Sequence, residues 1–157
     1  NVHEVLERVV ALIASEHREA VKLIRDYDPS LPPLSADPDQ LMQALLNITR
    51  NAVQSIAQDG HVIFRTRALT NFPIGAIRHK LVLSIEIEDN GPGVPADLAE
   101  SIFYPLVTGR PDGTGLGLPI SQDLVSRHGG LIEYQSRPGR TVFTVRLPAV
   151  APAPEVA

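Results

Sequence analysis

The chain has 157 residues, enough for one domain with a buried core, and only 4% of them are aromatic, which predicts an aliphatic core. A formal net charge of -4 without a basic stripe argues against nucleic acid as the main ligand, and the lack of cysteine excludes disulfides and thiolate metal sites. No apolar run approaches the roughly 20 residues of a membrane span, and the amino end lacks a signal-peptide pattern. Because the chain starts inside a helical pattern and without Met, we expect a piece of a longer protein.

The first elements are predicted to be a helix and a strand. Asn1 can cap a helix over residues 2–15, in which apolar side chains recur every three or four positions. Residues 20–27 alternate between two faces, which is typical of a strand. The prolines in residues 28–33 prevent regular pairing, so we expect a loop there.

A second helix is predicted from Asp37, as its N-cap, to about Gln58, with a buried stripe of Leu41, Leu45, Ile48, Ala52 and Ile56. Its opposite face carries amides and one arginine where a solvated helix usually carries Glu and Lys, namely Gln40, Gln43, Asn47, Arg50, Asn51, Gln54 and Gln58. Amide oxygens can bind magnesium and an arginine can bind phosphate. A polar face packed on a partner domain explains the pattern equally well.

Two further strands are predicted over residues 61–68 and 81–89, because both segments alternate between apolar and polar side chains. Pro73 and Gly75 interrupt residues 69–80, for which we expect a hairpin loop that can move. Asp89 continues the apolar face of the second strand, and a buried carboxylate needs hydrogen-bond partners. The following Asn-Gly-Pro-Gly forces a turn, so the strand ends on an inward acid beside bare backbone, which suits a flat polar ligand. An Asx turn that only caps the strand is the alternative.

The remaining chain alternates between loops and short elements. Residues 95–101 predict a short helix and residues 104–114 a loop that can move, followed by the run G-T-G-L-G-L at 113–118. This run leads into a helix with apolar positions Leu118, Ile120, Leu124 and Val125, closed by His128-Gly129-Gly130. Glycines at a helix N-terminus favour anion binding, but the run matches neither the dinucleotide fingerprint nor the phosphate loop with its lysine. Residues 131–136 and 141–147 predict a terminal hairpin, and residues 149–157 a disordered Pro/Ala tail.

Four motifs now stand in order: L-L-N-I-T-R-N-A at 45–52, D-N-G-P-G-V at 89–94, I-F-Y-P-L-V-T-G-R at 102–110 and G-T-G-L-G-L at 113–118. Together they resemble the N, G1, F and G2 boxes of the ATP-binding domain of sensor histidine kinases, a superfamily that includes gyrase and mismatch-repair ATPases. The sequences of residues 24–32 and 104–110 are similar to those of the nitrogen-regulation branch of the sensor histidine kinases. The resemblance implies that residues 1–148 form an α+β two-layer sandwich of the Bergerat type. Three helices would cover one face of a mixed, mostly antiparallel sheet, beside a mobile ATP lid.

The resemblance also implies roles for individual residues in binding MgATP. Asp89 would accept a hydrogen bond from the adenine amine, beside a base-binding turn that holds Gly91, Gly93 and Val94. Asn51 would ligate magnesium, Asn47 would hold phosphate or a metal-bound water, and Arg50 is the basic residue of the N box. Residues 104–114 would form the lid, with Thr108 and Arg110 near the phosphates, and Gly113, Gly115 and Gly117 would cradle the phosphates through backbone N–H groups. The other implied ATP-binding residues are Tyr104, Thr114, Leu116 and Leu118. Asn47, Asn51 and Arg110 would be the catalytic residues.

One position departs from the hydrolytic relatives, which carry Glu where this chain has Asn47. Without that base, attack by water should be slow, and the γ-phosphoryl group would be kept for a better-placed nucleophile. None of the five histidines stands in an H-E-x-x-N-P stretch, so we expect the acceptor histidine on a separate dimerisation domain.

The expected function is therefore cytoplasmic histidine kinase catalysis in nitrogen regulation, by a domain that is monomeric alone. The implied partners are the histidine-bearing dimerisation domain, a response regulator of the NtrC type and the PII signal protein. Two alternatives stay open: a module in which bound nucleotide gates binding of PII, and a protein-serine kinase of the anti-sigma type.

Overall fold

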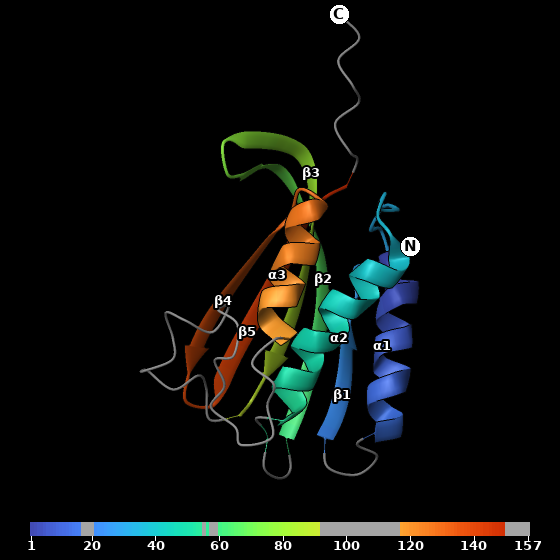
Figure 1. Ribbon diagram of the computed structural model, residues 1–157, viewed down its shortest axis with the longest axis vertical. Coiled ribbons are helices and arrows are strands. Elements are labelled where there is room, and N and C mark those ends of the chain that lie inside the picture. The colour runs from blue at the N-terminus through green and yellow to red at the C-terminus, as the bar shows by residue number, and fades with distance from the viewer. Residues whose placement is uncertain (17–20, 55, 57–59, 92–116, 150–157) are drawn as a thin grey trace, which may run out of the picture.

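The computed structural model describes residues 1–16, 21–54, 56, 60–91 and 117–149. Over these ranges the elements in chain order are α1 (Val2–Glu16), β1 (Val21–Asp26), α2 (Pro38–Gln54), β2 (Gly60–Ile74), β3 (Ile77–Asp89), α3 (Gly117–Arg127), β4 (Leu131–Arg137) and β5 (Arg140–Pro148). The strands form one sheet in the order β1-β2-β3-β5-β4, parallel between β1 and β2 and antiparallel elsewhere. All three helices lie on one face of it (Figure 1). The fold implied by the resemblance is confirmed.

The helix ends follow the local sequence. Asn1 caps α1, since its Oδ1 accepts from the backbone N–H of His3 at 2.9 Å, and Asp37 caps α2 by accepting from the N–H of Asp39 at 2.9 Å. At the end of α3, Gly129 takes the left-handed conformation, with φ of 74°, and the N–H of Gly130 donates to the carbonyl of Val125 at 3.0 Å. This is the glycine-terminated helix end that the sequence predicted.

The end of α2 was predicted too late. The helix ends at Gln54, and Ile56 is already outside it. The cause lies in the next element, because β2 begins at Gly60 directly against Ile56. A Cβ at Gly60 would stand 1.9 Å from Cγ2 of Ile56, so only glycine allows this close approach. The chain therefore turns before the predicted end at Gln58.

The loop predicted over residues 69–80 is wrong, because the segment continues both strands. Register is kept from Val62 opposite Asp89 to Ile74 opposite Ile77, and a two-residue turn joins the strands. Gly75, with φ of 60°, supplies the conformation that such a tight turn needs. Pro73 and Gly75 interrupt the sequence pattern, but Pro73 pairs with Arg78 within the ladder. The prediction failed because a proline near the end of a hairpin is compatible with pairing.

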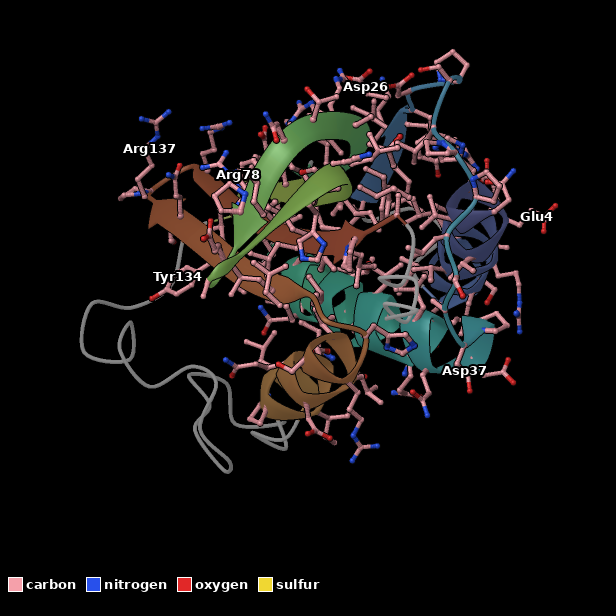
Figure 2. The ribbon with its side chains drawn as sticks, turned by 90° about the horizontal axis from the view of Figure 1, so that it is seen from above. Glu4, Asp26, Asp37, Arg78, Tyr134 and Arg137 are labelled. Atoms are coloured by element: carbon pink, nitrogen blue, oxygen red, sulfur yellow. The ribbon has the colours of Figure 1, made fainter. Side chains whose placement is uncertain are left out.

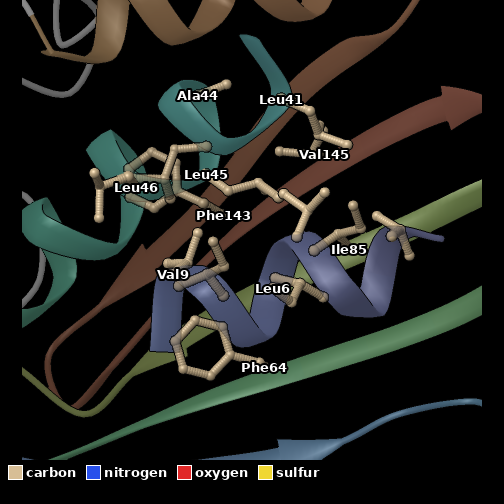
Figure 3. Close-up of a cluster of buried hydrophobic side chains, with 14 of the residues drawn as sticks. Leu6, Val9, Leu41, Ala44, Leu45, Leu46, Phe64, Ile85, Phe143 and Val145 are labelled. Carbon is tan, nitrogen blue, oxygen red and sulfur yellow. The ribbon is translucent and has the colours of Figure 1, made fainter. Parts of the chain in front are cut away.

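The core lies between the helices and the sheet, and it is aliphatic with few rings, as the composition predicted. Figure 3 shows side chains of α1 and α2 meeting those of β2, β3 and β5. Its members are fully or almost fully buried, among them Leu6, Val9, Leu41, Leu45, Phe64, Ile85, Phe143 and Val145. The predicted stripe of α2 is buried at Leu41, Leu45, Ile48 and Ala52, while Ile56 is only partly buried. The stripe is also wider than predicted, since Ala44, Leu46, Thr49 and Val53 are buried as well.

The wider burial of α2 follows from its position between α1 and α3 (Figure 1). The hydroxyl of Ser121 on α3 donates to the carbonyl of Ala44 at 2.9 Å, in a contact buried between the two helices. Ile120, predicted as one of the apolar positions of α3, is 44% exposed. Helix α3 therefore uses a narrower buried face than its sequence indicates.

The opposite face of the sheet carries charges in place of helices. Arg65 of β2 lies 3.3 Å from Asp26 of β1 and 2.7 Å from Glu86 of β3, and Arg140 of β5 lies 3.0 Å from Glu88. Seen from above, the β2–β3 hairpin bends over this face (Figure 2). Opposite charges in neighbouring strands thus pair across the face that none of the described helices covers.

Candidate functional site

Asp89 is the last residue of the central strand, β3, and its register partners are Val62 of β2 and Thr141 of β5. Its residue is only 2% exposed, so the predicted inward carboxylate is confirmed. Oδ1 accepts from the backbone N–H of Gly91 at 2.9 Å, which is the Asx turn considered as the alternative. The Asx turn is therefore present, and a role of the same carboxylate in binding a ligand stays a prediction.

Contacts from two other segments brace the turn after Asp89. Oδ1 of Asn90 accepts from the backbone N–H of His61, at the start of β2, at 2.9 Å. The N–H of Gly139, in the turn between β4 and β5, donates to the carbonyl of Gly91 at 3.0 Å. Gly60 lets Asn90 approach, since a Cβ there would stand 3.1 Å from its Oδ1. The turn after Asp89 is thus held by the start of β2 and by the turn between β4 and β5.

The polar face of α2 contains the predicted amide pair. Asn47 and Asn51 are both partly buried, and Nε2 of Gln43 donates to Oδ1 of Asn47 at 2.9 Å one turn earlier. Arg50 does not extend alone into solvent, because its Nη2 lies 2.7 Å from Oε1 of Glu16 on α1. The face is therefore an organised row of polar groups, in which a neighbouring helix contributes an acid.

The three segments that carry predicted site residues meet at one end of the molecule. The C-terminal half of α2, the end of β3 and the start of α3 lie toward the same end (Figure 1). Gly117 is the first residue of α3, and Leu118 packs against the core. The first turn of α3 has no acidic residue, so nothing on its own first turn offsets the positive end of the helix dipole.

The other predicted site residues lie outside the described ranges, as does the predicted helix over 95–101. These residues are Gly93, Val94, Tyr104, Thr108, Arg110, Gly113, Thr114, Gly115 and Leu116. Their roles stay predictions that rest on the sequence.

The arrangement offers a buried acceptor, amide oxygens, a guanidinium and a helix N-terminus at one end of the sandwich. Within the described ranges, no group of three or more His, Asp or Glu side chains is placed to hold a metal ion. A strongly bound resident metal does not fit these residues, whereas a magnesium ion that arrives with nucleotide phosphates and takes one amide ligand does. None of the described helices combines the length and apolar character that crossing a bilayer requires.

Two contributors were not found from the sequence. Glu16 reaches Arg50 across 34 positions of the chain, and Asn90 reaches His61 across 29. Glu16 lies just beyond the predicted end of the first helix, and Asn90 is typical of a turn, so neither position carries a local signal. Only the packing of α1 beside α2, and of β3 beside β2, reveals these contacts.

Comparison with known proteins gives the family. The sequence profile of the family described as "Histidine kinase-, DNA gyrase B-, and HSP90-like ATPase" matches residues 36–151. The sensory histidine kinase/phosphatase NtrB of Klebsiella oxytoca is 50% identical over 149 residues, which cover 94% of this chain and 43% of that protein. NtrB of Rhodobacter capsulatus is 43% identical, over 97% of this chain and 43% of that protein. The chain thus spans less than half the length of these relatives.

Solved structures agree with the sequence comparison. The nucleotide-free catalytic domain of histidine kinase ThkA superposes with a TM-score of 0.80 at 25% identity, and covers 95% of this chain and 93% of that domain. Full-length ShkA, solved in complex with AMPPNP, gives a TM-score of 0.78 at 29% identity, over 98% of this chain and 31% of that protein. The chain therefore belongs to the histidine kinase-, DNA gyrase B- and HSP90-like ATPase family, as a histidine kinase catalytic domain similar to that of NtrB.

Proposed function

We propose that this domain binds MgATP and donates the γ-phosphoryl group to a histidine on a separate dimerisation domain of the same kinase, in a nitrogen-regulation two-component system. The observation that carries the proposal is the buried carboxylate of Asp89, braced at the end of the central strand. An acceptor in that position selects the amine of adenine and opposes the carbonyl oxygen of guanine.

The phosphate end of the nucleotide would lie along the polar face of α2 and the start of α3. Asn51 would give magnesium one amide oxygen, and the ion would supply charge neutralisation to the phosphates. Asn47, held by Gln43 at 2.9 Å, would bind a phosphate oxygen or a metal-bound water. Arg50 and the glycine run before Gly117 would neutralise the remaining charge through guanidinium and backbone N–H groups. Thr108 and Arg110 would close over the phosphates from the lid.

The partners proposed with this function are the histidine-bearing dimerisation domain, a response regulator of the NtrC type and the PII signal protein. Resemblance to NtrB over 94% of the chain supports them. The absence of a carboxylate at Asn47 supports transfer over hydrolysis, since no general base is placed there to activate water.

The experiment is phosphoryl transfer in trans. The domain is incubated with magnesium and γ-labelled ATP, with and without a separate dimerisation domain that carries the acceptor histidine. We expect acid-labile label on the dimerisation domain alone, formed slowly because the missing tether lowers the effective concentration. Asn51→Ala should abolish transfer more severely than it weakens ATP binding, whereas Gln135→Ala, exposed on β4, should retain transfer. Label on serine, or on a histidine of this chain, would contradict the proposal.

A further inference from the structure

Arg50 is held by an acid from another helix. Its Nη2 lies 2.7 Å from Oε1 of Glu16, and its Nε donates to Oε2 of the same carboxylate at 3.4 Å. The two side chains are 39% and 33% exposed, so the pair is half-shielded by the α1–α2 packing. Two donors on one edge of the guanidinium thus meet both oxygens of one carboxylate.

The position of Glu16 is unusual for a residue that serves only its own helix. Glu16 is the last residue of α1, and the last turn of that helix contains no basic residue. The negative end of the helix dipole disfavours an acid there, so helix stability does not explain the choice of residue. The contact with Arg50 gives the carboxylate a favourable partner at that end.

The contact leaves part of the guanidinium unused. An arginine has five N–H donors in a rigid plane, and Glu16 engages the Nε and Nη2 edge. Among the described residues no hydrogen bond to Nη1 occurs. Arg50 also directly precedes Asn51 on the polar face of α2. A long arginine side chain loses considerable rotamer freedom when it binds an anion, and a side chain already held loses less.

We propose that Glu16 is a positioning residue for Arg50: it grips one edge of the guanidinium and presents the remaining N–H groups to the phosphates of bound nucleotide. The inference rests on the proposed function, which places phosphates along α2. Glu16 itself touches no nucleotide in this arrangement. It acts only through Arg50, in the manner of outer-shell carboxylates that orient the groups which bind a ligand.

The test is a double-mutant cycle on nucleotide affinity. Calorimetry measures AMPPNP with magnesium on the unmodified chain, Glu16→Gln, Arg50→Ala and the double variant, and an NMR titration measures adenosine, which has the base and lacks phosphates. Glu7→Gln is the matched control. It removes the same charge from the same helix, but Glu7 pairs with Arg25 of β1, at 2.8 Å, and not with Arg50. Thermal unfolding of every variant checks the fold.

We expect Glu16→Gln to weaken AMPPNP binding about two- to fivefold, the range for a half-exposed ion pair, with adenosine and Glu7→Gln unaffected. In the Arg50→Ala background, Glu16→Gln should not weaken AMPPNP binding further. Removing the negative charge of Glu16 in that background is expected to leave the affinity equal or slightly higher. Equal weakening of AMPPNP and adenosine would indicate a structural role and overturn the inference, as would tighter AMPPNP binding by Glu16→Gln alone. If Arg50→Ala has no effect, the inference fails while nucleotide binding stands, and if AMPPNP does not bind the unmodified chain, the proposed function fails with it.

Discussion

At the scale of single residues, the proposed function makes Asn47 the position that favours phosphoryl transfer over hydrolysis. Its amide is partly buried on α2 and accepts from Gln43 at 2.9 Å, and an amide does not take a proton from water at neutral pH. The family resemblance implies a Glu at this position in the hydrolytic members of the superfamily. The expected difference in chemistry therefore depends on one side chain.

Asn47→Glu should raise ATP hydrolysis by at least about tenfold, because a positioned general base contributes roughly 10²- to 10⁴-fold. Phosphate release measured under saturating MgATP gives the rate. Gln40→Glu is the control, since it adds the same charge to the same face of α2 nearer the start of the helix. Equal rates for Asn47→Glu and the unmodified domain would show that a missing base does not limit hydrolysis.

Protonation of His3 should make the free energy of unfolding depend on pH. Its ring stacks on Tyr27, with centroids 4.6 Å apart, and its Nε2 lies 2.9 Å from Oγ1 of the fully buried Thr66. Burial lowers the pKa of His3 below 6.5 and outweighs the attraction of Asp28 and Glu7, which raises it. The folded chain therefore resists protonation that the unfolded chain accepts.

The free energy of unfolding should fall as the pH drops from 6.5 through the lowered pKa of His3, because the unfolded state binds more protons in that window. Above pH 6.5 the histidine is neutral in both states, so its contribution is fully present. Urea unfolding at a series of pH values measures the slope, and His3→Gln should flatten it. His79→Gln, in the β2–β3 hairpin, is the comparison. A slope that His3→Gln leaves unchanged would refute this assignment.

At the scale of elements, three helix ends could be predicted because their signals are local, whereas the end of α2 depends on the close approach of Gly60 to Ile56. Asn1 and Asp37 act as caps, and Gly129 ends α3, each through contacts within a few residues. The loop over residues 69–80 was wrong because pairing along the hairpin depends on the partner strand. The buried face of α2 was predicted too narrow for the same reason, since α1 and α3 cover it from both sides.

In the candidate site too, local features could be predicted from the sequence and tertiary contacts could not. Asp89 could be predicted because strand alternation places it on the apolar face. Its brace by Asn90 and Gly139, and the grip of Glu16 on Arg50, join segments far apart in the sequence. No pattern along the chain contains that information, because it arises from tertiary packing.

Two substitutions in β2 compare how much its buried part and its hairpin part contribute to the free energy of unfolding. Phe64 is fully buried between the helices and the sheet, so Phe64→Ala should lower the free energy of unfolding by about 3–5 kcal/mol. Phe72 lies in the part wrongly predicted as a loop, half-buried, with the guanidinium of Arg146 4.9 Å from its ring centre. Phe72→Ala should therefore cost less, about 1 kcal/mol. Denaturant unfolding compares the two, and equal losses would contradict the placement of the core.

At the scale of the whole molecule, the proposed function needs an acceptor histidine that this chain does not supply in a recognisable context. The chain spans 43% of the length of its NtrB relatives, and it has neither an H-E-x-x-N-P stretch nor a carboxylate at Asn47. Positioning and electrostatics dominate phosphoryl transfer, so bound ATP without an in-line acceptor should remain largely unreacted. Nucleotide binding is then the property of this chain that can be measured on its own.

The most direct measurement is calorimetric binding of ATP and GTP, each with magnesium, to the unmodified chain and to Asp89→Asn. A site built around one buried acceptor should bind ATP at least about a hundredfold more tightly than GTP. Asp89→Asn retains an oxygen for the N–H of Gly91 but places an amide donor against the adenine amine, so it should lose most ATP affinity while the fold survives. Asp39→Asn, on the exposed first turn of α2, should bind ATP normally. If ATP and GTP bind the unmodified chain alike, Asp89 is not the adenine acceptor.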